Sequence, residues 1–217
     1  MTASASRSPL SRRSLLAASA ATGLALCESA LAAPAAPAAP GKSTEAAVLT
    51  ISGPGVRGNR GPLDPVADLL LKNHGLAFDT AWTTGAGALE RLPTVEITPH
   101  IEYDGQPHRL RGPLLATVLQ AAGVDSAAAA AKGQWITLQA IDGYRAQLPL
   151  AQALQWRMLL ATHMDGRRLG LGGLGPQWAM YDADRIAELA GKPLKERFAQ
   201  APWGLYHMGL HAQQPQG

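Results

Sequence analysis

Residues 170–182 read Gly-Leu-Gly-Gly-Leu-Gly-Pro-Gln-Trp-Ala-Met-Tyr-Asp, a glycine-rich loop that runs directly into a short apolar segment. Four glycines within six residues allow positive φ angles and let the backbone approach a ligand or another strand closely. Pro176 ends this freedom, and residues 177–181 predict a short buried strand. The stretch therefore predicts either one wall of a pocket or a tight turn between two core strands.

The segments on either side of this stretch alternate between strand and helix patterns. Residues 112–123 carry apolar side chains at a helical period and end at a glycine. Short alternating or apolar runs predict strands at residues 94–98, 135–141, 156–162 and 203–211. Asp-Gly pairs predict tight turns at residues 104–105, 142–143 and 165–166. We therefore expect an α+β fold, a mixed β-sheet domain with short helices.

The N-terminal region has the composition of an export signal followed by a tether. Arg12 and Arg13 precede an alanine-rich apolar run, and small residues at 30–32 predict cleavage after Ala32. The paired arginines resemble the twin-arginine export motif, and an ordinary secretory leader is the alternative. We expect a signal at residues 1–32, a Pro/Ala-rich tether at 33–46, the domain at 47–212 and a disordered tail at 213–217. This predicts a periplasmic protein.

Charge and cysteine content exclude several classes of protein. The formal net charge is +3, and part of it lies in the leader, so the body of the chain has no basic run that would favour nucleic acid. The apolar run of the leader is too short for a stable transmembrane anchor. Cys27 is the only cysteine and precedes the predicted cleavage point, so we expect no thiol in the mature chain.

No sequence motif identifies a metal or a nucleotide site. His207 and His211 are four residues apart, but on a strand this spacing separates them by about 13 Å, and we interpret them as surface histidines rather than metal ligands. The glycines at 170–175 precede a strand instead of opening a helix, which argues against dinucleotide binding. No Gly-Xaa-Ser-Xaa-Gly sequence supports a serine hydrolase.

The order of several segments resembles the oxidoreductase molybdopterin-binding domain of the sulfite-oxidase type. The segments that carry the resemblance are Arg111-Gly112-Pro113-Leu114-Leu115, Asp142-Gly143-Tyr144, Leu148-Pro149-Leu150, Asp165-Gly166, Gly175-Pro176-Gln177-Trp178 and Trp203-Gly204-Leu205. The resemblance implies a sulfite-oxidase-type molybdopterin-binding fold and a molybdenum–pterin cofactor used in redox chemistry. In that family a protein cysteine shortly before the Gly-Pro-Leu-Leu helix helps to hold the metal.

This chain departs from the family at that ligand, because Thr98 or a neighbour stands where a cysteine is expected. A neutral hydroxyl is a far poorer ligand than thiolate for such a centre. We therefore expect no cofactor of the conventional form and no metal site, with a molybdopterin held by other contacts as the alternative. The candidate cofactor- or ligand-binding residues are Thr98, His100, Arg111, Asp142, Tyr144, Arg145, Gly175 and Trp178.

Three classes of function remain open at this point. The first is a non-catalytic domain that binds a small-molecule ligand or a periplasmic protein partner. The second is an active oxidoreductase that holds molybdopterin without a cysteine, and the third is a structural or assembly role. If His100, Tyr144 and Trp178 line one pocket, their side chains should converge in the structure.

Overall fold

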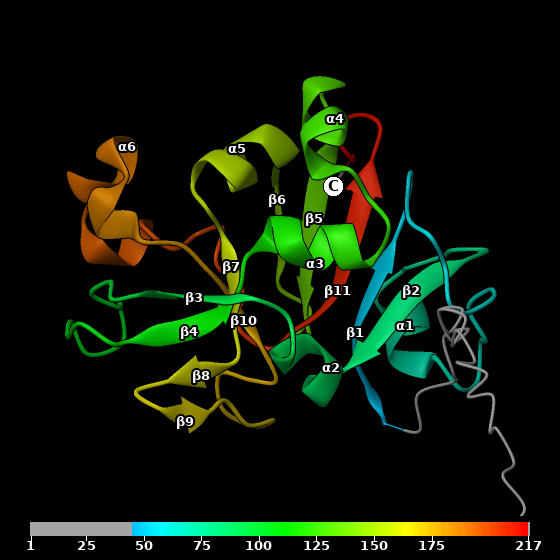
Figure 1. Ribbon diagram of the computed structural model, residues 1–217, viewed down its shortest axis with the longest axis horizontal. Helices are drawn as coiled ribbons and strands as arrows, with labels where there is room; N and C mark the ends of the chain where they lie inside the picture. The colour runs from blue at the N-terminus through cyan, green and yellow to red at the C-terminus, as the bar shows by residue number, and fades with distance from the viewer. Residues whose placement is uncertain (1–44, 217) are drawn as a thin grey trace, which may run out of the picture. The chain divides into compact units, whose positions relative to one another are not determined.

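The computed structural model describes residues 45–216, which form three β-sheets joined by short helices (Figure 1). This arrangement confirms the predicted α+β class. The predicted leader, and the tether up to residue 44, lie outside the described residues. The strands are β1 (Ala47–Ser52), β2 (Ala81–Gly85), β3 (Thr94–Ile97), β4 (Leu110–Pro113), β5 (Trp135–Ala140), β6 (Arg145–Pro149), β7 (Leu159–Ala161), β8 (His163–Met164), β9 (Arg167–Arg168), β10 (Trp178–Met180) and β11 (Leu205–His211).

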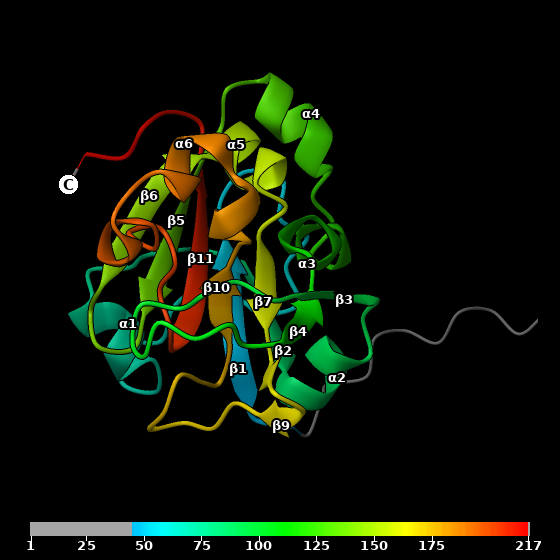
Figure 2. The same ribbon diagram turned by 90° about the vertical axis from the view of Figure 1, so that its left-hand side faces the viewer.

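The helices are short and lie between the strands in the sequence. None of those in the described residues is long and apolar enough to cross a membrane. In Figures 1 and 2, α4, α5 and α6 lie at one end of the domain and β9 lies at the other. The helices are α1 (Leu69–Asn73), α2 (Ala86–Glu90), α3 (Leu115–Ala121), α4 (Ser126–Ala131), α5 (Leu150–Gln155) and α6 (Ala187–Ala190), with 3-10 turns η1 (Ala183–Arg185) and η2 (Leu194–Glu196).

A five-stranded sheet with the order β2-β1-β11-β5-β6 forms the centre of the domain. The strands β1 and β11 are parallel, and the other neighbours in this sheet are antiparallel. The β5–β6 hairpin turns at Asp142-Gly143, as the sequence predicts, and Gly143 has a φ of 94°. The remaining strands form a four-stranded sheet, β3-β4-β8-β9, and the pair β10-β7.

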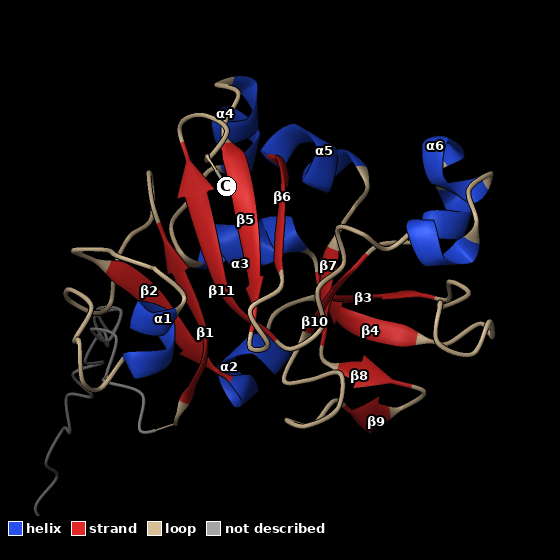
Figure 3. Cartoon of the chain, turned by 180° about the vertical axis from the view of Figure 1, so that it is seen from behind, coloured by secondary structure: helices blue, strands red, loops and turns tan. Residues whose placement is uncertain are grey.

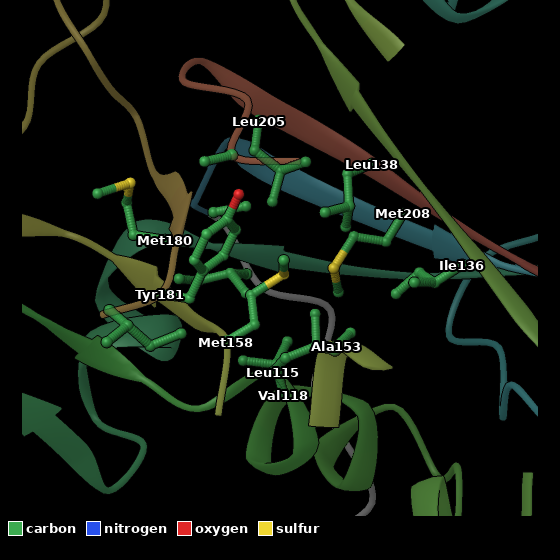
Figure 4. Close-up of a cluster of buried hydrophobic side chains, with 14 of the residues drawn as sticks. Leu115, Val118, Ile136, Leu138, Ala153, Met158, Met180, Tyr181, Leu205 and Met208 are labelled. Atoms are coloured by element: carbon green, nitrogen blue, oxygen red, sulfur yellow. The ribbon is translucent and has the colours of Figure 1, made fainter. Parts of the chain in front are cut away.

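The main core lies between the five-stranded sheet and the helices α3 and α5 (Figure 4). On α3, Leu115, Val118 and Leu119 are fully buried because they share one face of the helix. They meet Ile136 and Leu138 of β5 together with residues of β11 and β7. Burying a leucine or isoleucine of this kind contributes about 2 kcal/mol to folding.

The opposite face of the same sheet is polar, and it can be seen in Figure 3, where α1 lies over part of it. Its buried polar side chains come from β1, β5 and β11. They are Thr50, Ser52, Thr137, Gln139 and His207. A register shift in the β5–β11 pairing lies between Leu205 and His207, so Tyr206 bonds to His74 instead of joining the core. A buried polar face needs internal hydrogen bonds, and Ser52 and Thr137 bond there to His207 and His211.

Two of the predicted elements differ clearly from the structure in their bounds. The helix predicted at residues 112–123 begins at Leu115, because Gly112 is a strand residue of β4 that packs directly on the backbone of β7. A Cβ at Gly112 would lie 1.8 Å from the carbonyl oxygen of Leu160. The strand predicted at residues 156–162 shrinks to β7, because Trp156 ends α5 and Arg157 takes a φ of 51°.

Candidate functional site

Two side chains at the end of the glycine-rich stretch, the amide of Gln177 and the indole of Trp178, hold this segment inside the core. Gln177 Nε2 donates to the carbonyl oxygens of Val48, at 2.8 Å, and Leu205, at 2.5 Å. Trp178 is 1% exposed, and its Nε1 donates to the carbonyl oxygen of Ala201 at 2.8 Å. The strand prediction for this segment is therefore confirmed as β10, and Trp178 is a core residue that anchors the segment before β11.

Thr98 lies on the rim of a hollow of about 590 Å³ between β3, the end of α5 and the η1 turn. We call it the Thr98 hollow. Three carboxylates and two guanidinium groups line it together with apolar side chains. These charged residues are Glu96, Asp182, Asp184, Arg157 and Arg185. Thr98, which itself or through a neighbour takes the place where the resemblance implies a cysteine, thus lies in a polar hollow with more acidic than basic groups.

Asp184 connects the Thr98 hollow to His100. Its Oδ2 accepts from the backbone N–H of His100 at 2.9 Å and lies 3.0 Å from His100 Nδ1. Its Oδ1 accepts from Arg197 Nη1 at 2.9 Å. Burial opposes ionisation, but these partners lower the pKa of Asp184 below its usual value, so the carboxylate is charged at neutral pH. His100 therefore serves here as a partner of Asp184 and does not itself line the hollow.

Asp182, in the same hollow, has the opposite shift. Burial raises its pKa above the usual value, and the nearby charge of Arg185 reduces the effect. The ion pair between Arg185 Nε and Asp182 Oδ2 is 3.3 Å long, and the guanidinium side is largely exposed. An ion pair with one exposed partner is weak. Arg185 therefore compensates the partly buried carboxylate of Asp182 only in part.

The donor atoms at the Thr98 hollow do not fit the ordinary molybdenum centre. The described residues contain no cysteine, and Thr98 offers only a neutral hydroxyl. No group of three or more His, Cys, Asp or Glu side chains among residues 45–216 is placed to hold a metal ion. The sulfite-oxidase-type resemblance implies a protein thiolate on the metal, and the residues of this hollow supply none, so we derive no reaction step through such a centre.

Asp142 and Tyr144 line a different hollow, of about 330 Å³, which we call the tyrosine hollow. Its walls come from the 101–106 turn, the β5–β6 turn and the segment before β11. Tyr144 Oη donates to the carbonyl oxygen of Ala199 at 2.7 Å, and Asp142 Oδ1 accepts from the backbone N–H of Tyr144 at 2.9 Å. Trp178 lies behind this hollow, with its ring 6.0 Å from that of Tyr103.

The other candidate residues lie elsewhere. Arg145 belongs to the polar face of the five-stranded sheet, where its Nε donates to Gln139 Oε1 at 2.8 Å and its Nη2 to the carbonyl oxygen of His74 at 2.9 Å. Arg111 is on β4, opposite Glu96 of β3 and His163 of β8. Gly175 packs against the Leu169 backbone, from which a Cβ would be only 2.6 Å away.

The expectation that His100, Tyr144 and Trp178 converge on one pocket is therefore wrong. His100 faces Asp184, Tyr144 lines the tyrosine hollow, and Trp178 is buried behind it. The reason is that Asp184 binds the backbone and the ring of His100 on the side of the η1 turn, while Trp178 belongs to the buried strand β10. Whether each candidate residue contacts a ligand stays a prediction.

The polar face of the sheet contains a serine–histidine pair that sequence reasoning missed. Ser52 Oγ lies 3.0 Å from His207 Nε2, and Thr137 Oγ1 lies 2.9 Å from His211 Nε2. The interpretation of His207 as a surface residue is wrong, because it is 2% exposed. Burial, with smaller effects of His211 and Arg145, lowers the pKa of His207 to about 3. An imidazole of such low basicity is a poor general base, so the pair does not indicate a hydrolase.

Comparison with known proteins agrees with the resemblance seen in the sequence. Residues 106–172 match the family model described as the oxidoreductase molybdopterin binding domain. This range runs from the turn before β4 to the loop after β9 and includes Arg111, Asp142, Tyr144 and Arg145. The chain thus resembles this domain family over the segment that contains α3, the β5–β6 hairpin and α5. Thr98, His100, Gly175 and Trp178 lie outside the matched range.

Among solved structures, the chain is similar to the sulfane dehydrogenase SoxCD from Paracoccus pantotrophus, with 14% sequence identity and a TM-score of 0.47. The similar region covers 63% of this chain and 36% of the SoxCD chain. The match therefore spans about a third of the length of that protein. No curated protein matches the sequence.

Proposed function

We propose that this chain is an exported, non-catalytic binding domain that resembles molybdopterin-binding oxidoreductase domains and takes a small ligand or a periplasmic protein partner. The observation that supports the proposal is the Thr98 hollow, where three carboxylates lie around Thr98 and the described residues offer no thiolate. Charge supports the same conclusion. The pterin cofactor carries a phosphate and an anionic dithiolene, and carboxylates at a hollow repel both.

The second candidate is an oxidoreductase that holds molybdopterin without a cysteine ligand. The match over residues 106–172 favours it, as do the guanidinium groups of Arg157 and Arg185, which suit phosphate. The paired arginines of the leader add support, because the twin-arginine route carries folded proteins that can load a cofactor before export. Export to the periplasm is common to both candidates, and the alanine-rich leader with its small residues before position 33 supports it.

Metal and pterin analysis separates the two candidates. The full chain is expressed in a host that makes the molybdenum cofactor, together with a resident molybdenum enzyme that reports on cofactor supply. We expect neither molybdenum by mass spectrometry nor pterin by fluorescence after oxidation in the purified protein. Stoichiometric molybdenum in the wild-type chain would overturn the binding-domain proposal.

The Thr98→Cys variant sharpens this experiment, because it restores the thiol at the position that the family resemblance indicates. If only the ligand is missing, Thr98→Cys gains pterin and molybdenum that the wild type lacks. If the acidic hollow itself excludes the cofactor, the variant stays free of both. Thr94→Cys, at the start of β3 and not lining the hollow, serves as the matched control for unspecific metal uptake by a new thiol.

A further inference from the structure

The tyrosine hollow concentrates aromatic side chains in a chain that is only 5% aromatic. Four rings line this one hollow of about 330 Å³, and the indole of Trp178 supports it from behind. The four are Tyr103, Tyr144, Phe198 and Trp203. They come from three segments far apart in the sequence, so no local pattern brings them together. An aromatic cluster of this kind at a surface hollow is a common feature of ligand sites.

Two of these rings are open to solvent and are nevertheless held in place. Tyr103 is 54% exposed and Tyr144 is 48% exposed. The hydroxyl of Tyr144 is fixed by its bond to the Ala199 carbonyl, and the ring of Tyr103 lies against the buried Trp178. Because their positions are already fixed, these rings lose little conformational freedom when a ligand binds.

The charges beside the rings are predominantly negative. Glu102 and Asp142 line the hollow, and Lys195 is the one cation among its lining residues in the described part of the chain. Glu102 makes no ion pair within 4 Å with any residue of 45–216, Lys195 included. Burial raises the pKa of Glu102, and the charge of Lys195 offsets this only in part, so the carboxylate has lost hydration without gaining a direct ion-pair partner among the described residues. A positively charged ligand would supply that partner.

We propose that the tyrosine hollow binds a small organic cation of the alkylammonium class, with its charged head group against the ring faces and Glu102 and Asp142 at its side. The faces of tyrosine and tryptophan rings attract cations through their quadrupole, and the attraction is strongest for poorly hydrated heads such as quaternary ammonium. This inference names a ligand class for the binding domain proposed above and rests on that proposal.

An inorganic cation fits this hollow less well. Ca²⁺ and Mg²⁺ need six or more oxygen ligands, and the lining residues in the described part of the chain include only two carboxylates, Glu102 and Asp142. Among the described residues no cluster of three metal-binding side chains occurs here or elsewhere. A methylated ammonium group instead presents apolar carbon to the rings and spreads its positive charge over several methyl groups. It therefore suits both the aromatic rings and the carboxylates of the hollow.

Choline and its neutral isostere 3,3-dimethylbutan-1-ol test the charge requirement directly. The two molecules have the same shape, and a carbon replaces the ammonium nitrogen in the second. Titration of the full chain is followed by calorimetry and by intrinsic tryptophan fluorescence, to which Trp203 in the wall of the hollow contributes. We expect choline to bind saturably and the neutral isostere at least about 10-fold more weakly. Equal binding of the two, or no saturable choline binding below about 10 mM, would overturn the proposal.

Two variants locate the site. Tyr103→Ala removes an open ring, and Glu102→Gln removes a charge with little change of shape, so each should weaken choline binding by about 2- to 30-fold. Leu171→Ala and Glu196→Gln are matched controls, because both residues are exposed and neither lines the hollow. Circular dichroism and the melting temperature check that all variants are folded. Choline affinity unchanged in folded Tyr103→Ala and Glu102→Gln would refute the assignment.

These outcomes are independent of the molybdenum analysis. Stoichiometric molybdenum with choline bound at the tyrosine hollow would refute the binding-domain proposal but leave the cation site standing. If the protein contains neither molybdenum nor pterin and does not bind choline, only the cation-site proposal is refuted.

Discussion

His207 should make the stability of this domain depend on pH between pH 7 and pH 5. It is 2% exposed on the polar face of the five-stranded sheet, and burial lowers its pKa from 6.5 to about 3. In that pH range the unfolded chain takes up a proton on this histidine, and the folded chain does not. The unfolded state therefore binds more protons, and the free energy of unfolding falls as the pH falls.

The size of the effect follows from the two pKa values. Protonation of an unfolded histidine with a pKa of 6.5 stabilises the unfolded state by about 2 kcal/mol between pH 7 and pH 5. The folded state gains almost nothing over the same range, since its pKa lies well below pH 5. The loss would continue toward pH 3, where carboxylates also titrate, so the upper range gives the cleaner measurement.

Urea denaturation of wild type and His207→Gln at pH 7 and pH 5 isolates this contribution. Glutamine can still bond to Ser52 but does not titrate. From pH 7 to pH 5, the free energy of unfolding of His207→Gln should therefore fall by about 2 kcal/mol less than that of wild type. His163 and His211, whose pKa values burial also lowers, are present in both chains and cancel. Ser52→Ala is the control, because it removes the partner hydroxyl and leaves the buried imidazole to titrate.

Equal losses of stability in wild type and His207→Gln would refute this reasoning. Such a result would mean that the imidazole takes up its proton in the folded state at a pH near 6.5, as an exposed histidine does. A nuclear magnetic resonance titration of the ring protons in the folded protein gives an independent check.

Two further predictions concern close packing and an exposed ion pair. Gly112→Ala should destabilise the domain by about 3 kcal/mol in urea denaturation, because its Cβ would meet the Leu160 carbonyl at 1.8 Å; Gly191→Ala, in open space, should stay within about 0.5 kcal/mol of wild type. His108 lies 2.6 Å from Asp165 and 2.9 Å from Asp104, and these carboxylates raise its pKa, so its stabilising effect is present below pH 6.5 and is lost as the pH rises through the folded pKa. Asp165→Asn should lower that pKa in a resonance titration, and an unchanged value would contradict the assigned cause.

Local sequence patterns predicted much of the secondary structure. The Asp-Gly pairs at 142–143 and 165–166 form the expected hairpin turns, because glycine provides the positive φ that such turns require. The predicted bounds of helices and strands were wrong where tertiary packing determines them. Gly112 looks like the start of a helix in sequence, yet it lies in β4 because only a residue without a side chain fits against Leu160.

The candidate site was predictable only in part, for a related reason. Asp142 and Tyr144 are neighbours in a turn, and the sequence correctly places them together at an exposed position. Folding brings Tyr103, Phe198 and Trp203 to the same hollow, and their spacing in the sequence does not predict this. The burial of His207 could not be predicted either, because an alternating pattern does not show what covers the polar face of a strand.

The position of β11 between β1 and β5 has a consequence for when the domain can fold. The strands β1 and β2 form one hairpin-like pair, β5 and β6 form another, and only residues 205–211 join the two into a sheet. During synthesis, both pairs leave the ribosome well before the strand that connects them. The central sheet therefore cannot assemble until residue 211 has emerged, and until then the apolar faces of β1 and β5 depend on other partners to stay soluble.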